Sequence, residues 1–356
     1  MKYDLFVFAG QSNMMGACVL PPKHRLDIKY CKEYKYKSVY LGGKTGEFVT
    51  VGYNNGEFLY KNIKAAYGDA DENGKSRVND YGKNTYFVSA MSNLNSVSEK
   101  STNQFSIYSE SEKNSACSIV PYFCENWEQL GQAAIVAHVA KGGVTASYYF
   151  SKEMTEEYNL FAVKNGYEPI VGDEAAETVY CEKCKAFFKD AEKVYGHDNI
   201  GEKILIWHQG ESDSGNSCAE YKQKLNIFWK KAKKLGFDRF FIIRCGFWYT
   251  HETCHIMRAQ EEFCRENKET HIISRSISFM PDPYFMDSLE DYYIKEPEKK
   301  YFFCRDSYYG YDNSHINERG FMLAAKEAAQ NAYRIMKENK EPDLKEDIVK
   351  YVTTHF

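Results

Sequence analysis

The chain has 356 residues, of which 43% are hydrophobic and 27% charged, and its formal net charge is -4. At roughly 150 residues per domain, this length predicts two domains or one domain with a large insertion. The sequence has no basic block that would follow phosphates and no run of about 18 apolar residues that would span a bilayer, so we expect neither nucleic acid nor membrane as a partner. Composition does not specify an oligomeric state.

Eleven cysteines are scattered along the chain. An odd number of cysteines in a long chain is not typical of a small secreted disulfide scaffold. The N-terminal segment MKYDLFVFAGQ has an apolar run that Gly10 and Gln11 interrupt, and a secretory signal would need a longer one. These features predict a cytoplasmic protein.

Short apolar runs rich in β-branched and aromatic residues alternate with helical patterns. Such runs are typical of strands that are buried on both faces of a parallel sheet. The expected strands are residues 5–9, 133–140, 203–209, 239–247 and 271–276. The expected helices are roughly 174–195, 217–235, 253–268 and 317–337. This alternation predicts a doubly wound α/β sheet.

Residues 20–118 interrupt the alternation. They are rich in Gly, Asn, Ser, Tyr and Lys, with hairpin-like pieces and turn signals at 54–56 and 72–74. Two further segments, 144–172 and 277–311, also read as irregular. We therefore expect one domain over residues 1–338, with an insertion at roughly 20–118, and a C-terminal tail over 339–356.

The first strand ends in FAGQSN, which places Ser12 where the chain turns from strand to helix. Ligands of open parallel sheets bind beyond the carboxyl ends of the strands. Free backbone N–H groups at such a turn favour an anion, which suits the oxyanion of acyl transfer. Ser12 is thus either a helix cap or a nucleophile.

A candidate base for this serine lies near the other end of the chain, in YDNSHINERG. Asp312 and His315 are three residues apart, so the carboxylate can reach one imidazole nitrogen while the other nitrogen faces a serine. The alternative is a loop pair that caps the last helix.

A third block, ILIWHQGESDSG, is again a strand that ends in a turn with glycine. The amide of Gln209 can donate a hydrogen bond to an oxyanion at the sheet edge. Glu211 and Asp213 could serve as general acids or bases, although hydrogen bonds that tie the loop together are the favoured interpretation.

Together, GQSNMMG, WHQGESD and DNSH resemble the sialate O-acetylesterase and acetylxylan esterase branch of the SGNH (GDSL-like) hydrolases. SIVPYFCENW, AKGG and IMRAQEEF are also similar to this branch. The resemblance implies a flavodoxin-like three-layer α/β/α fold with a parallel central sheet and a large insertion. It also implies a serine esterase that removes O-acetyl groups from a sugar or oligosaccharide through an acyl-enzyme, with neither metal nor cofactor.

Carried over by motif, the resemblance makes Ser12 the nucleophile, His315 the base and Asp312 its orienting carboxylate. The oxyanion hole would combine the backbone N–H of Ser12, the amide of Gln209 and a donor from the second block. That block reads SACSIVPYF and lacks the usual glycine, so Ser118 or Cys117 would supply the N–H. Gln11, Asn13 and Glu211 are the expected substrate-binding residues.

Other readings stay open at this point. A catalytically weak glycan-binding protein on a hydrolase scaffold is one alternative. A zinc metallopeptidase is a less favoured one: HETCH matches H-E-x-x-H, with His251 and His255 as ligands and Glu252 as base, but no third ligand motif follows. Trp207, Trp248 and Tyr249 could stack on a sugar face, although ordinary packing is the favoured interpretation.

Overall fold

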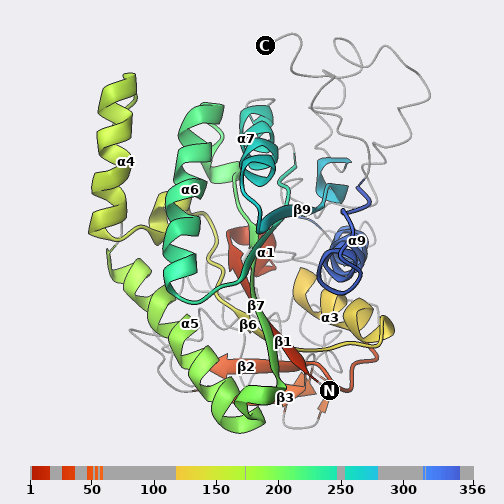
Figure 1. Cartoon of the computed structure of the whole chain (residues 1–356). Coiled ribbons are helices and arrows are strands. Elements are labelled where there is room, and N and C mark those ends of the chain that lie inside the picture. The colour runs from red at the N-terminus through yellow and green to blue at the C-terminus, as the bar shows by residue number, and fades with distance from the viewer. Residues whose placement is uncertain are drawn as a thin grey trace, which may run out of the picture.

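A mostly parallel sheet forms the centre of the protein. The structure, a computed structural model, describes residues 2–16, 26–36, 46–50, 53–54, 57–58, 118–172, 174–246, 253–279, 316 and 318–344. Within these ranges a seven-stranded sheet has the order β3-β2-β6-β1-β7-β8-β9 (Figure 1). Its strands are β1 (Tyr3–Gly10), β2 (Lys32–Tyr36), β3 (Gly46–Thr50), β6 (Ala133–His138), β7 (Ile200–His208), β8 (Arg239–Ile243) and β9 (Thr270–Ser274). Only β3 runs antiparallel to its neighbour in this described sheet.

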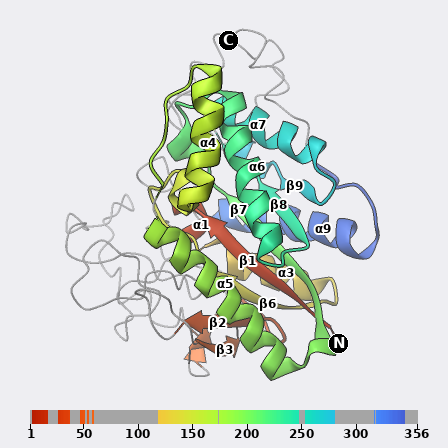
Figure 2. The ribbon, with the colours of Figure 1, turned by 60° about the vertical axis from the view of Figure 1, so that its left-hand side comes forward.

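Helices cover both faces of the sheet, so the protein has three layers (Figures 1 and 2). One face carries α4 (Lys152–Asn165), α5 (Glu174–Tyr195), α6 (Cys218–Lys234) and α7 (Thr253–Glu266). The other carries α3 (Ile119–Gln129) and α9 (Glu318–Lys337). Short elements are α1 (Ser12–Met15) and the 3-10 turns η2 (Ala146–Tyr149), η3 (His197–Asn199), η4 (Glu211–Asp213) and η5 (Ser276–Phe279). The predicted α/β class with a parallel central sheet is confirmed.

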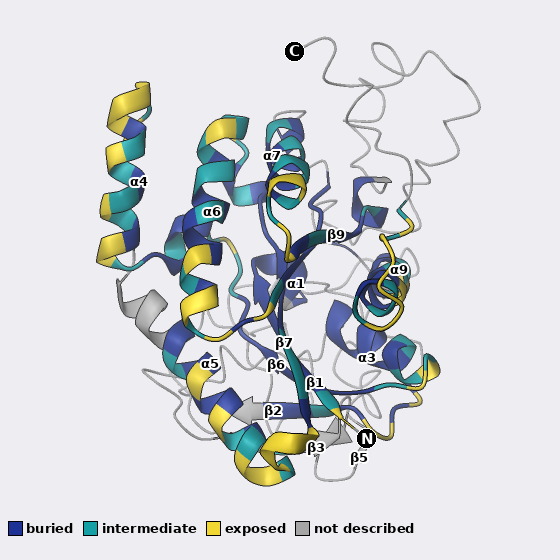
Figure 3. Ribbon diagram, in the orientation of Figure 1, coloured by how far each residue is buried: buried dark blue, intermediate teal, exposed yellow. Residues whose placement is uncertain are grey.

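The central strand β1 supplies both cores, as its continuous apolar sequence predicts. Successive side chains of a strand point to opposite faces. Leu5 and Val7 accordingly pack in the core beneath α5 and α6, whereas Phe6 and Phe8 pack beneath α3 and α9. The ring of Phe6 meets Trp127 of α3 edge-on, with centroids 5.2 Å apart. The sheet is therefore buried on both sides, which Figure 3 shows as dark blue strands between half-buried helices.

The expected strands and helices are all present, with small differences at their ends. Two helices were not predicted. α4 lies inside the segment 144–172, which we expected to be irregular. Its helical pattern is weak, because only Met154, Tyr158 and Ala162 are buried and most of its other residues are polar. Its ends do carry sequence signals, since Ser151 caps the first turn and Gly166 adopts the left-handed conformation after the last. α3 also lies outside the predicted helices, although Ser118 at its N-cap is a start signal.

The predicted insertion is partly built into the sheet. β2 pairs in parallel with β6, and β3 extends the sheet beyond it. The hairpin predicted around the turn signal at 54–56 is present as β4 (Tyr53–Asn54) paired with β5 (Glu57–Phe58). Most of the remaining insertion lies outside the described residues.

The start of the predicted tail folds back on α9. Asn331 accepts a hydrogen bond from the backbone N–H of Asp343 at 2.6 Å and donates to its carbonyl oxygen at 3.2 Å. Residues 345–356 lie outside the described ranges. Among the helices that the structure describes, none has the length and apolar character needed to cross a membrane.

Candidate active site

Ser12 lies at the carboxyl edge of the sheet, as its sequence position predicts. β1 ends at Gly10, and Ser12 is the first residue of the short helix α1. Ser12 is 9% exposed, and its hydroxyl makes no hydrogen bond with any other residue that the structure describes. The hydroxyl is therefore available to a base and to a substrate.

Gln11 joins the first sequence block to the third. Its side-chain oxygen accepts hydrogen bonds from the backbone N–H of Gly210 at 3.3 Å and of Ser212 at 3.1 Å. It also accepts from the amide of Gln209 at 3.2 Å. The oxygen of Gln11 thus supports the turn, whereas the predicted contact of Gln11 with a substrate stays a prediction.

Asn13 brings all three blocks together. Its Nδ2 donates to Oε1 of Glu211 at 3.1 Å, and its Oδ1 accepts from the backbone N–H of Ile316 at 3.0 Å. Ile316 directly follows His315 in the sequence. The residue that directly follows the predicted base therefore contacts the nucleophile turn, whereas Asp312 and His315 themselves lie outside the described residues.

Beneath Asn13 lies a buried ion pair that was not predicted. Nε2 of His208 is 3.3 Å from Oε1 of Glu211, and Nδ1 of His208 is 2.9 Å from the carbonyl oxygen of Ile243. An acceptor oxygen lies near each imidazole nitrogen, but Nε2 does not meet hydrogen-bond geometry, so its contact with Glu211 is that of an ion pair with the doubly protonated imidazolium. The sequence signal was His208 itself, a polar residue that directly follows the apolar run from Ile204 to Trp207.

The electrostatics of the pair agree with this geometry. Burial by itself would lower the pKa of His208, but the Glu211 carboxylate and the Ile243 carbonyl outweigh it and raise that pKa above its ordinary value. Burial would raise the pKa of Glu211, yet His208 and the Asn13 amide hold it below its ordinary value. Oε2 of Glu211 is buried and has no hydrogen-bond partner among the described residues.

Gln209 is fully buried, and its amide is engaged inside the protein. Its Nε2 donates to Asp213 at 2.7 Å and lies 3.2 Å from both the Val144 carbonyl and the Gln11 side chain. Its Oε1 accepts from the hydroxyl of Tyr221 at 2.7 Å. An amide has two hydrogens, so none is left for an oxyanion in this arrangement. The oxyanion role expected for Gln209 stays a prediction, and its contacts favour a structural role.

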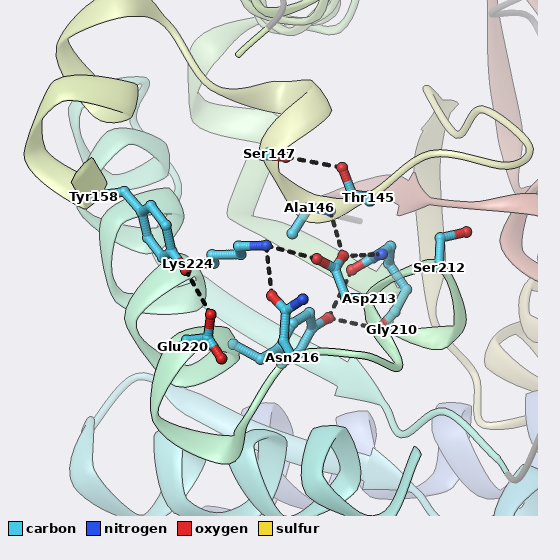
Figure 4. A network of polar contacts seen from close by, with 12 residues as sticks. Thr145, Ala146, Ser147, Tyr158, Gly210, Ser212, Asp213, Asn216, Glu220 and Lys224 are labelled. Atoms are coloured by element: carbon cyan, nitrogen blue, oxygen red, sulfur yellow. Dashed lines mark hydrogen bonds and ion pairs between the residues drawn. The ribbon is translucent and has the colours of Figure 1, made fainter. Parts of the chain in front are cut away.

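Asp213 and Lys224 form a second buried pair behind this loop (Figure 4). Oδ1 of Asp213 is 2.8 Å from Nζ of Lys224, and its Oδ2 accepts from the backbone N–H of Ala146 at 2.7 Å. Lys224 also donates to Asn216 at 2.6 Å. The interpretation of Asp213 as a residue that ties the loop together is confirmed.

Loss of the Lys224 charge should strongly lower the stability of the protein. A Lys224→Met variant is expected to lower the free energy of unfolding by about 3–5 kcal/mol, because it leaves the Asp213 carboxylate buried without its cation. Lys230→Met is the matched control on the same helix, since Lys230 pairs with Glu157 at an exposed site and should contribute less than about 1 kcal/mol. Urea unfolding measures both, and equal losses would contradict a structural role for the buried pair.

Ser118 is the N-cap residue of α3, with its side chain 3.4 Å from the N–H of Val120. α3 has 11 residues and leads through a short link into the amino end of β6. At 1.5 Å per residue, α3 therefore runs back along β6, and its first turn lies near the edge where the strands end and where Ser12 lies. Ser118 is a suitable place for a second oxyanion donor, and Cys117 lies outside the described ranges.

The aromatic residues that could stack on a sugar and the H-E-x-x-H motif lie only partly within the described residues. Trp207 has no exposed surface and packs among aromatic side chains, so ordinary packing is confirmed for it. Trp248, Tyr249, His251 and Glu252 lie outside the described residues, whereas His255 belongs to α7. In the described part of the chain, no three histidine, cysteine or acidic side chains are grouped as metal ligands would be.

Comparison with known proteins gives structural likeness alone. No protein-family model matches the chain, and no curated protein matches it. A protein from Arabidopsis thaliana of known structure is similar with a TM-score of 0.49 and 10% identity, over 94% of this chain and 98% of that chain. A carbohydrate acetylesterase from Xanthomonas citri is similar with a TM-score of 0.47 and 10% identity, over 95% of this chain and 57% of that chain. Such distant likeness does not transfer an activity.

Proposed function

We propose that this chain is a serine esterase that removes O-acetyl groups from a carbohydrate through an acyl-enzyme intermediate. The observation that carries the proposal is the pair of hydrogen bonds made by Asn13. They tie the nucleophile turn to Glu211 of the third block and to Ile316, the neighbour of His315. Segments that the resemblance assigns to one active site thus meet beside Ser12.

In the proposed mechanism, His315 takes the proton of Ser12 as its oxygen attacks the acetyl carbonyl, and Asp312 orients the imidazole. His315 then returns the proton to the departing sugar oxygen. Water attacks the acetyl-enzyme by the reverse proton path and releases acetate.

Backbone donors are the favoured oxyanion hole. Because the Gln209 amide is bonded within the protein, we assign the developing negative charge first to the backbone N–H of Ser12, with the block around Ser118 as the predicted source of a second donor. Of the residues expected to bind substrate, Asn13 and the side-chain oxygen of Gln11 are engaged by protein atoms. Oε2 of Glu211 has no partner among the described residues, but it is buried, so the proposed contact of Glu211 with a sugar hydroxyl rests on the resemblance alone.

The first test uses the wild-type protein. We expect it to hydrolyse a chromogenic acetyl ester, to release acetate from acetylated sugars and to react with a fluorophosphonate at Ser12, located by peptide mass spectrometry. A folded protein that binds acetylated sugars but neither turns over the ester nor labels at Ser12 would instead support the glycan-binding alternative.

A further inference from the structure

We propose that Asn13 is a positioning residue that holds Ile316, the residue after His315, against the nucleophile turn, and that the buried His208–Glu211 pair sets the orientation of the Asn13 amide. We call the group formed by Glu211, Asn13 and Ile316 the Asn13 clamp. The inference rests on the proposed function insofar as it takes Ser12 and His315 as nucleophile and base.

Two contacts of Asn13 with described residues favour one orientation of its amide. Its NH₂ group faces the carboxylate of Glu211 and its oxygen faces the N–H of Ile316, at 3.1 and 3.0 Å. A flipped amide would bring oxygen against oxygen at Glu211 and N–H against N–H at Ile316. Both contacts would then be lost together, so each depends on the other.

The ion pair below the clamp keeps this orientation. An ionised carboxylate has no hydrogen to donate, so Glu211 can only accept from the amide of Asn13. Ionisation of Glu211 is favoured because His208 lies 3.3 Å away, and both side chains are buried. The charge of Glu211 therefore determines which atom of Asn13 is presented to Ile316.

The clamp acts at short range on both proposed catalytic groups. Ser12 precedes Asn13 and His315 precedes Ile316, and adjacent Cα atoms are about 3.8 Å apart. The side chain of Ile316 is fully buried in the core between α3 and α9, so this residue is anchored through both its backbone and its side chain. A displacement of about 1 Å at a reacting group can reduce turnover by about 10²-fold.

Asn13→Asp tests the clamp with an isosteric change. The variant keeps an oxygen for the Ile316 N–H but places a second carboxylate oxygen against Glu211. We expect kcat for the chromogenic ester to fall about 10²-fold with KM within about twofold, and the Ile316 amide to exchange its hydrogen faster. Asn331→Asp is the matched control, because Asn331 is equally buried and bridges Ile273 and Asp343 far from the site. It should lower stability without changing kcat or the exchange at Ile316.

A reciprocal exchange provides the rescue. In the Asn13→Asp/Glu211→Gln double variant, residue 211 carries the amide donor and residue 13 carries the acceptors, so both clamp contacts can form again. We expect it to recover about tenfold of the lost kcat and part of the Ile316 protection. If Asn13→Asp does not fold, Asn13→Ala removes both contacts without adding a charge and tests the same expectation.

The outcomes separate this inference from the proposed function. An active wild type whose Asn13 variants keep kcat and Ile316 protection overturns the clamp and leaves the esterase in place. A wild type without turnover or labelling at Ser12 overturns the esterase and with it the positioning role. Loss of kcat without rescue in the double variant overturns the part assigned to Glu211.

Discussion

A Ser12→Ala variant is expected to lose about 10⁴-fold or more of its turnover of a chromogenic acetyl ester. The hydroxyl is the only atom of that residue that could form the acyl-enzyme, and removal of a triad nucleophile leaves only what binding and the oxyanion hole supply. At about 1.4 kcal/mol per tenfold, the loss corresponds to at least about 5 kcal/mol of transition-state stabilisation. Steady-state kinetics and fluorophosphonate labelling measure the effect.

The fold should survive this substitution, because the Ser12 hydroxyl has no hydrogen-bond partner among the described residues. Ser214→Ala is a suitable control, since Ser214 lies on the neighbouring loop after η4 and its side chain has no role in the mechanism. A folded Ser12→Ala protein with the turnover of the wild type would refute the assignment of the nucleophile.

A Gly10→Ala variant is expected to lose more than about 4 kcal/mol of unfolding free energy, which is an exceptional effect for one methyl group. Gly10 has a φ of 144°, which residues with a Cβ rarely adopt, and an added Cβ would lie 1.9 Å from the carbonyl oxygen of His208. β1 and β7 would have to separate at the end where Ser12 is presented. The same carbonyl accepts from the N–H of Gln11 at 3.1 Å, so that contact would also be lost.

Gly131→Ala is the control that distinguishes a steric clash of the added Cβ from the cost of a positive φ. Gly131 also has a positive φ, 74°, but nothing lies within 4 Å of its missing Cβ. We expect it to lose only about 1 kcal/mol, the ordinary penalty for a side chain in the left-handed region. Chemical denaturation of both variants provides the comparison, and equal losses would contradict the close approach of β1 to β7.

Much of the architecture could be predicted because its signals are local. Each strand of the central sheet from β1 to β9, apart from those in the insertion, contains a short apolar run, and α5, α6, α7 and α9 show a helical period. α4 was not predicted because it buries few residues. The position of β2 in the main sheet could not be predicted because β2 pairs with β6, about 100 residues further along the chain.

The sequence by itself determined the fold class, the position of Ser12 after a buried strand and the three blocks that suggested an esterase. Only the tertiary structure decided what the polar side chains around Ser12 contact. Gln209 meets Gln11 across 198 positions and Val144 across 65, and Asn13 meets Ile316 across 303. Periodicity and capping depend on neighbours within a few residues. These hydrogen bonds instead form because β1, β6 and β7 bring their carboxyl ends to one edge of the sheet and the residue before α9 lies beside them.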